Sequence, residues 1–197
     1  MKDRFDFITH VDSRHLRWAG TFARLIAFTH GRDESRPSDL IAGVYVANFE
    51  RVAGFWPRPD LLEDFVAEKC DWSEPRWLTW QRWEDEIRHA TRHFYIPFTS
   101  SYLTIRTKWS KRRFVGHYFK GSHEWKKLFD LGERLTPYRA DFHGRNLPLL
   151  TPEVMLLAVI RADDLPLGEA LLESGVIVNK VEEAATRHID NPETLRF

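Results

Sequence analysis

Two histidines and a glutamate have a spacing that could hold a metal ion. Glu86, His89 and His93 stand at positions i, i+3 and i+7, so they would share one face of a single helix. Imidazole and carboxylate groups are zinc ligands, and a further ligand would have to come from elsewhere, such as His117 or His123. A metal-dependent enzyme centred on His89 and His93 is therefore one hypothesis for this chain.

Two arginines in the same segment argue against a metal. Arg88 and Arg92 interrupt the histidine pattern, and their charges would repel a cation. The segment is explained more simply as the polar face of a helix whose opposite face carries Trp77, Trp80 and Trp83. We therefore predict no bound metal and no cofactor.

Nucleophilic chemistry has little support in the sequence. No Gly-x-Ser-x-Gly motif is present, and Ser100 and Ser101 stand at the edge of a predicted strand with no helix after them. Cys70 ends a short amphipathic segment, where a cysteine is more often a small buried residue than a nucleophile. The sequence thus predicts a protein that is not an enzyme.

Composition excludes several other classes. The chain has 197 residues, is 43% hydrophobic and 29% charged, and has a formal net charge of zero. Its single cysteine excludes an internal disulfide and a cysteine-based zinc site. The longest apolar run, residues 154–160, is far shorter than the ~20 residues that a membrane-spanning helix needs. We expect a cytoplasmic protein of one domain with its own core.

The balanced charge hides a strongly basic segment. Residues 99–127 hold eight Lys or Arg residues and one acid, Glu124, whereas residues 128–197 carry an excess of acids. Alternation predicts strands over 99–108 and 113–119, which together would form a basic β-hairpin. Its candidate partner-binding residues are Arg106, Lys108, Trp109, Lys111, Arg112 and Arg113.

Two kinds of partner fit this hairpin. Bases interleaved with aromatic residues can neutralise phosphates and stack on nucleobases, so a nucleic-acid-binding protein is the alternative function. The same cations can instead pair with acidic residues of this chain or of a protein partner. We place a protein partner before a nucleic acid.

Apolar periodicity predicts a mainly α-helical fold. The expected helices cover residues 12–30, 37–54, 60–69, 74–92, 123–135, 151–160, 167–174 and 176–188, with a loop over 136–150. Asp12 or Ser13 would cap the first helix and Gly31 would end it. The helix over 151–160 is the most hydrophobic, and Leu157 in its centre is expected to be buried.

The order of these elements suggests an internal repeat. A helix, a loop, a capped apolar helix and a short Leu-Leu helix occur near residues 12–69 and again near 122–188. We therefore predict a first helical repeat over 1–71, an inserted Trp-rich helix and basic hairpin over 72–121, and a second repeat over 122–197. The three parts would form one compact domain.

The second copy resembles a known family. Thr151-Pro152-Glu153, the run from Met155 to Arg161, Asp163-Asp164, Leu167 to Leu172 and Ser174-Gly175-Val176 are similar to the repeat of Clp N-terminal domains. The resemblance covers about 130 residues and is weaker in the first copy, where Gly43 replaces a core leucine. No nucleotide-binding Gly-x-x-x-x-Gly-Lys motif accompanies it.

The resemblance implies a binding function. Clp N-terminal domains are the substrate- and adaptor-binding heads of Clp/Hsp100 unfoldases, so the expected partner is an unfoldase or one of its substrates. The chain would then be a stand-alone, non-enzymatic adaptor or regulator. It would hold a peptide in a groove where the two repeats meet.

Overall fold

A computed structural model describes residues 9–95, 102–106, 120–142 and 144–187 of the chain, and within these ranges it describes no side chains for residues 86–95, 102–106 and 120. The helices of this part are α1 (Arg14–Thr29), α2 (Pro37–Val52), η1 (Ala53–Phe55), α3 (Pro59–Lys69), α4 (Arg76–Ala90), α6 (His123–Leu135), α7 (Pro152–Ile160), α8 (Pro166–Glu173) and α9 (Val178–Thr186). The strands are β1 (Val11–Asp12), β2 (Glu34–Ser35), β3 (Thr91–Tyr95), β4 (Tyr102–Arg106), β5 (Lys120–Gly121), β6 (Arg139–Phe142) and β7 (Arg145–Leu150).

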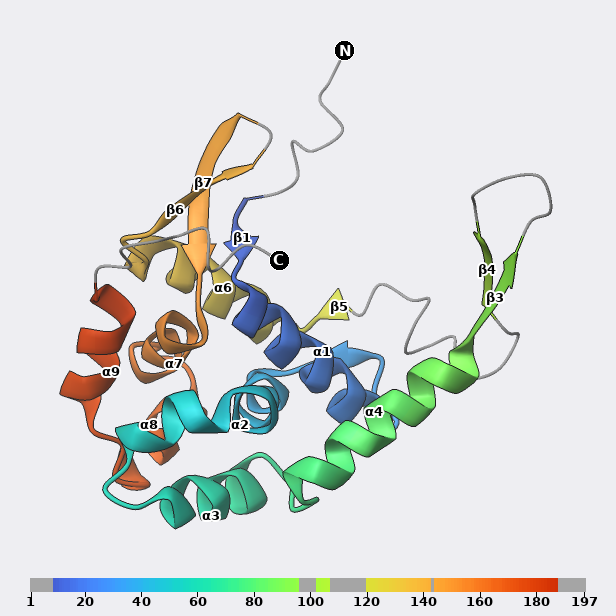
Figure 1. Cartoon of the computed structure of the whole chain (residues 1–197). Coiled ribbons are helices and arrows are strands. Elements are labelled where there is room, and N and C mark those ends of the chain that lie inside the picture. The colour runs from blue at the N-terminus through green and yellow to red at the C-terminus, as the bar shows by residue number, and fades with distance from the viewer. Residues whose placement is uncertain (1–8, 96–101, 107–119, 143, 188–197) are drawn as a thin grey trace.

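The fold is mainly α-helical, as predicted, with a small three-stranded sheet. Helices α1 and α2 pack against each other, α3 and α4 contact α2, and α7 contacts both α1 and α2 (Figure 1). Helices α6, α8 and α9 pack around α7, and α8 also contacts α3. The sheet has the order β1-β7-β6, in which β1 runs parallel to β7 although residues 11 and 149 are far apart in the sequence. A second parallel pair, β2 with β5, joins the loop after α1 to the start of α6.

The predicted capping residues begin and end the helices. The hydroxyl of Ser13 accepts the N–H of Leu16 at 3.2 Å at the start of α1, and Thr151 accepts the N–H of Val154 at 3.3 Å at the start of α7. Gly31 follows α1 with a φ of +69°, a conformation in which glycine carries no steric penalty. Local sequence chemistry therefore determines where these two helices begin and where α1 ends.

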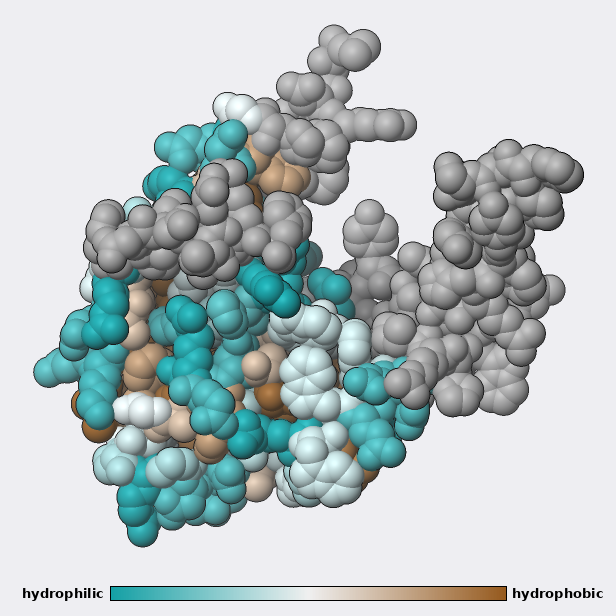
Figure 2. Space-filling view, viewed as in Figure 1, coloured by the Kyte–Doolittle hydropathy of each residue, from teal (hydrophilic) through white to brown (hydrophobic). Residues whose placement is uncertain are grey.

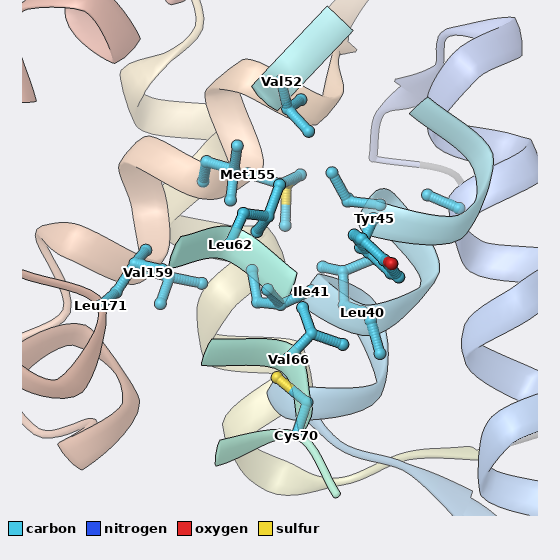
Figure 3. Packing of buried hydrophobic residues seen from close by; sticks show 14 of the residues in the cluster. Leu40, Ile41, Tyr45, Val52, Leu62, Val66, Cys70, Met155, Val159 and Leu171 are labelled. Atoms are coloured by element: carbon cyan, nitrogen blue, oxygen red, sulfur yellow. The ribbon is translucent and has the colours of Figure 1, made fainter. Parts of the chain in front are cut away.

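One hydrophobic core joins both halves of the described chain. It includes Leu40 and Ile41 from α2, Leu62 and Val66 from α3, and Met155 from α7 (Figure 3). Helix α7 is buried on every side from Pro152 to Val159, as expected for a helix without a polar face. Because α2 and α7 share this core, the two halves form one packed unit.

Helix α2 is kinked at a buried polar residue. Asn48 has φ −133° and ψ 24°, which interrupts the helical backbone. Its amide donates to the carbonyl of His15 at 3.1 Å, so the kink is held from α1. Beyond the kink, Arg51 forms an ion pair with the buried carboxylate of Glu153 at the start of α7.

The loop predicted over 136–150 contains a β-hairpin instead. Strands β6 and β7 pair antiparallel with Arg139 opposite Pro148, and Gly144 makes the turn with a φ of +78°. The carboxylate of Asp141 accepts the N–H of Gly144 at 2.9 Å. Pro148 favoured a loop because proline has no N–H to donate to a neighbouring strand. Strand β1 pairs with β7 only at Leu149 and Leu150, so Pro148 lies outside this pairing.

The predicted basic hairpin is also corrected. The strand expected over 99–108 is present as β4, but its partner is β3, which pairs antiparallel with it from Thr91 opposite Arg106 to Tyr95 opposite Tyr102. The helix expected over 74–92 therefore ends at Ala90. The residues expected to end this helix belong instead to strand β3, which pairs with β4. The second strand expected over 113–119 lies outside the described residues.

The surface is mostly polar on the face shown in Figure 2, where pale and brown residues interrupt the hydrophilic surface beside α4. Within the described ranges, no helix combines the length and the apolar character that crossing a bilayer requires.

Candidate functional site

Most of the predicted partner-binding residues lie outside the described part of the chain. Lys108, Trp109, Lys111, Arg112 and Arg113 all fall there. Arg106 is the last residue of β4, and its backbone position is known. The expectation that these cations bind a partner therefore stays a prediction.

The one-helix arrangement behind the metal hypothesis is wrong. Glu86 and His89 belong to α4, whereas His93 lies on β3 opposite Thr104. The spacing i, i+3, i+7 therefore does not place all three on one helical face. Among the side chains that the structure describes, no group of three or more His, Cys, Asp or Glu residues could hold a metal ion.

The tryptophans of α4 divide between core and surface. Trp80 packs edge-on against Phe22 with ring centroids 4.5 Å apart, and its indole N–H donates to the carbonyl of Val46 at 3.3 Å. Trp83 meets Trp18 edge-on at 5.0 Å. These contacts fix α4 on α1 and α2. Trp77, one turn earlier, is 68% exposed.

Trp77 stands at a groove between α2, α3 and α4. The groove has a volume of about 620 Å³ and, with Trp77, is lined by Tyr45, Val46, Glu63, Asp64, Ala67, Trp72, Ser73, Glu74, Pro75, Arg76 and Trp80. We call it the aromatic–acidic groove. We expected a groove where the two halves meet, whereas this one lies between the first half and the helix that follows it.

The connection from α3 to α4 shapes the groove floor. Asp71 adopts a φ of 54°, an uncommon left-handed conformation that turns the chain after α3. Trp72 is then buried, and its indole N–H donates to the hydroxyl of Thr79 at 3.3 Å. A side-chain hydrogen bond thus ties this connection to α4.

Acidic side chains outnumber basic ones in this groove. Glu63, Asp64 and Glu74 face a single lining arginine, Arg76. Arg82, outside the lining, holds Glu74 through an ion pair. The groove therefore offers a negative potential beside exposed aromatic surface.

Arg76 is itself held by an aromatic ring. Its guanidinium carbon lies 3.7 Å from the ring centre of Phe49 and 5.8 Å from that of Tyr45. Burial raises the pKa of the Tyr45 hydroxyl, and the neighbouring carboxylate of Glu63 adds to this effect while Arg76 opposes it. Tyr45 is therefore a neutral hydrogen-bonding group at physiological pH. The cation–π contact shows that these rings already accommodate a cation.

Cys70 is unsuited to nucleophilic chemistry in the folded protein. It is buried at the end of α3, where burial raises the pKa of its thiol and the nearby Asp39 carboxylate adds to the effect. We predict that a thiol reagent such as DTNB labels folded protein roughly a hundredfold more slowly than denaturant-unfolded protein. Stoichiometric labelling of the folded chain at the unfolded rate would contradict this assignment.

Comparison of the chain with protein-family models, with curated proteins and with solved structures found no match.

The groove was not predicted from the sequence. Glu63 and Asp64 lie on α3, whereas Tyr45 lies on α2. Their convergence depends on how α2 and α3 pack, which local periodicity does not determine. A local signal was present in Trp72 and Glu74, an aromatic and an acid beside a proline at the predicted start of a Trp-bearing helix.

Proposed function

We propose that the protein is a non-enzymatic binding module that holds a basic segment of a partner protein in the aromatic–acidic groove. The observation that carries this proposal is the exposure of Trp77 at the groove. Tryptophan is enriched at binding hot spots because its large ring buries much area and loses little conformational freedom. On a helix otherwise fixed by Trp80 and Trp83, the exposed ring offers a large apolar area that a partner can bury.

Charge indicates the chemistry of the partner. The carboxylates of Glu63 and Asp64 beside the ring of Trp77 suit lysine or arginine side chains, which can pair with the acids and lie over the ring. A nucleic acid would be repelled from this groove by the same carboxylates. The groove therefore complements a positively charged peptide, whereas the basic segment around Arg112 was expected to choose an acidic partner.

The comparison of the two halves supports a module resembling a stand-alone Clp N-terminal domain. Helices α2 and α7 each begin with a proline and bury an acidic residue in the first turn. Asp39 of α2 pairs with Arg32, and Glu153 of α7 pairs with Arg51. We propose that residues 12–69 and 122–188 are two copies of one helical unit, with α4 as an inserted helix. An unfoldase or its substrate is the partner class that this resemblance implies.

A synthetic peptide panel tests the groove. The peptides share their aromatic residues and differ in carrying lysine, glutamine or glutamate at the remaining positions, and binding is measured by isothermal titration calorimetry. We expect the lysine peptides to bind most tightly. Trp77→Ala should weaken that binding by roughly 30-fold or more, the effect of removing a hot-spot residue.

Leu172→Ala is the matched control, because Leu172 is the other large hydrophobic residue found exposed in the described part. It lies on α8, away from the groove lining, and should leave binding unchanged. Equal binding of lysine and glutamate peptides, or equal effects of the two substitutions, would overturn the proposal.

A further inference from the structure

A second concave site lies between α1 and α4, and its lining shares no residue with that of the aromatic–acidic groove. It has a volume of about 440 Å³ and is lined by Arg14, Arg17, Trp18, Thr21 and Trp83. We call it the α1 basic site. Its described lining holds two guanidinium groups and no carboxylate, so its charge is opposite to that of the groove.

The arginines follow the helical period along the exposed face of α1. Four residues at positions i, i+3, i+7 and i+10 share this face, namely Arg14, Arg17, Thr21 and Arg24. The three arginines are exposed, and α1 contains no acidic residue. Because a helix rises about 15 Å over ten residues, this positive face is longer than a single phosphate group.

Contacts within the described part of the chain do not account for Arg14 and Arg24. Neither side chain forms a hydrogen bond or an ion pair with another described residue. Arg14 is moreover the first residue of α1, where the helix dipole disfavours a positive charge. Arg24 also borders a neighbouring hollow whose lining includes Asp12, but Asp12 faces His10 at 3.6 Å. Both cations therefore remain available to an external anion.

Two indole rings form the apolar part of the site. Trp18 and Trp83 meet edge-on with ring centroids 5.0 Å apart. Trp18 also lies against Phe22 and Trp80, with centroid separations of 6.3 and 5.2 Å. These contacts fix the two indoles on the hydrophobic core, yet both side chains are only partly buried. A flat ligand ring can therefore stack on an aromatic surface that is already in place, without ordering a mobile side chain.

We propose that the α1 basic site binds single-stranded nucleic acid, a partner and a surface other than those of the groove. Successive phosphates would lie along the arginines of α1, and an unstacked base would lie against the indole of Trp18. This assignment differs from the alternative function expected from the sequence, which placed a nucleic acid on the basic segment around Arg112.

The combination of charge and rings selects this partner over other anions. A duplex keeps its bases stacked on one another, so they cannot lie on an indole of the protein. An acidic peptide would use the arginines but would not need the rings. The length of the positive face favours a strand with several phosphates over a free nucleotide.

Fluorescence anisotropy of the full chain with a labelled oligodeoxythymidine of about a dozen nucleotides tests the proposal. We expect binding that weakens steeply between about 50 and 200 mM salt, because phosphate contacts release counterions. An unlabelled duplex of the same length, polyglutamate and thymidine monophosphate should each compete about tenfold less well or worse. Absence of binding to the labelled strand, or equal competition by any of the three, would overturn the proposal.

Removing charge and removing a ring should have different effects. Arg14→Gln/Arg24→Gln should lower the slope of log affinity against log salt by about 1.4, since each phosphate contact on a single strand contributes about 0.7. Its Tm should not change, because neither arginine has a described partner. Trp18→Leu, studied where circular dichroism shows it folded, should instead weaken binding about tenfold at every salt concentration and leave the slope unchanged.

Matched controls locate the site. Trp77→Leu removes the exposed tryptophan of α4 that lies outside the α1 basic site, and Arg58→Gln/Arg187→Gln removes two other exposed arginines. Both variants should bind the strand as the unchanged protein does. Binding that is lost in Arg112→Gln/Arg113→Gln but kept in Arg14→Gln/Arg24→Gln would place the nucleic acid on the basic segment and overturn the assignment.

Discussion

Replacing Arg32 by alanine should lower the free energy of unfolding by about 3–5 kcal/mol, the cost of leaving a buried charge without its partner. Arg32 binds Asp39 through two hydrogen bonds, of 2.8 and 2.7 Å. The carboxylate of Asp39 has 0% exposure. Among the described residues, the backbone N–H of Arg36 would still donate a hydrogen bond to it after the substitution. Equilibrium unfolding in urea measures the loss.

Two variants test this explanation. Arg58→Ala removes an arginine from an exposed pair with Asp60, and should change stability by about 0.5 kcal/mol or less. The double variant Arg32→Ala/Asp39→Ala should be more stable than Arg32→Ala alone, because it no longer buries a lone charge. A loss below about 1 kcal/mol for Arg32→Ala would show that Asp39 reaches solvent or another donor.

Leu157→Ala should cost roughly 2–5 kcal/mol, the usual range for truncating a buried leucine. Leu157 is 6% exposed within α7, whose neighbours on both sides are also buried. The helix packs against both α6 and α9, so a cavity there is enclosed by several elements and cannot close by a small movement of one of them. The same urea measurement gives the loss.

Leu172→Ala removes the same atoms from an exposed position and should change stability by less than about 0.5 kcal/mol. Comparable losses for the two leucines would contradict the burial of α7. Because both substitutions remove the same atoms, the difference between their effects on stability measures the contribution of burial.

The helices could be predicted well from the sequence because the signals that begin and end a helix are local. Ser13, Ser122 and Thr151 cap the helices that follow them through side-chain oxygens. Apolar residues then recur on one face of α1 and α6, and α7 is apolar on every side. Gly175 follows α8 with a φ of +85°, a conformation that glycine adopts readily at the end of a helix. These features need only residues within one or two turns of each other.

The strands were harder to predict because their partners are distant or weakly patterned. β6 alternates polar and apolar residues over only four positions and lacks β-branched residues, so its strand signal is weak. The helix expected over 74–92 included Thr91 and Arg92, which instead pair with β4. The aromatic–acidic groove depends on such nonlocal packing, because Glu63 of α3 meets Tyr45 of α2 only in the folded protein.

The parallel pairing of β1 with β7 has a consequence for the order in which the chain can fold as it is synthesised. The N–H of Ser13 donates to the carbonyl of Leu150 at 2.8 Å, so the residue that caps α1 is itself anchored by the second half. Helices α1 and α2 are neighbours in sequence and can associate early, whereas β1 must wait for residues 149 and 150 to emerge. We therefore expect this long-range pairing to form after α1 and α2 have associated. A nascent chain stalled before residue 149 would hold a helical hairpin whose first strand has no template to join.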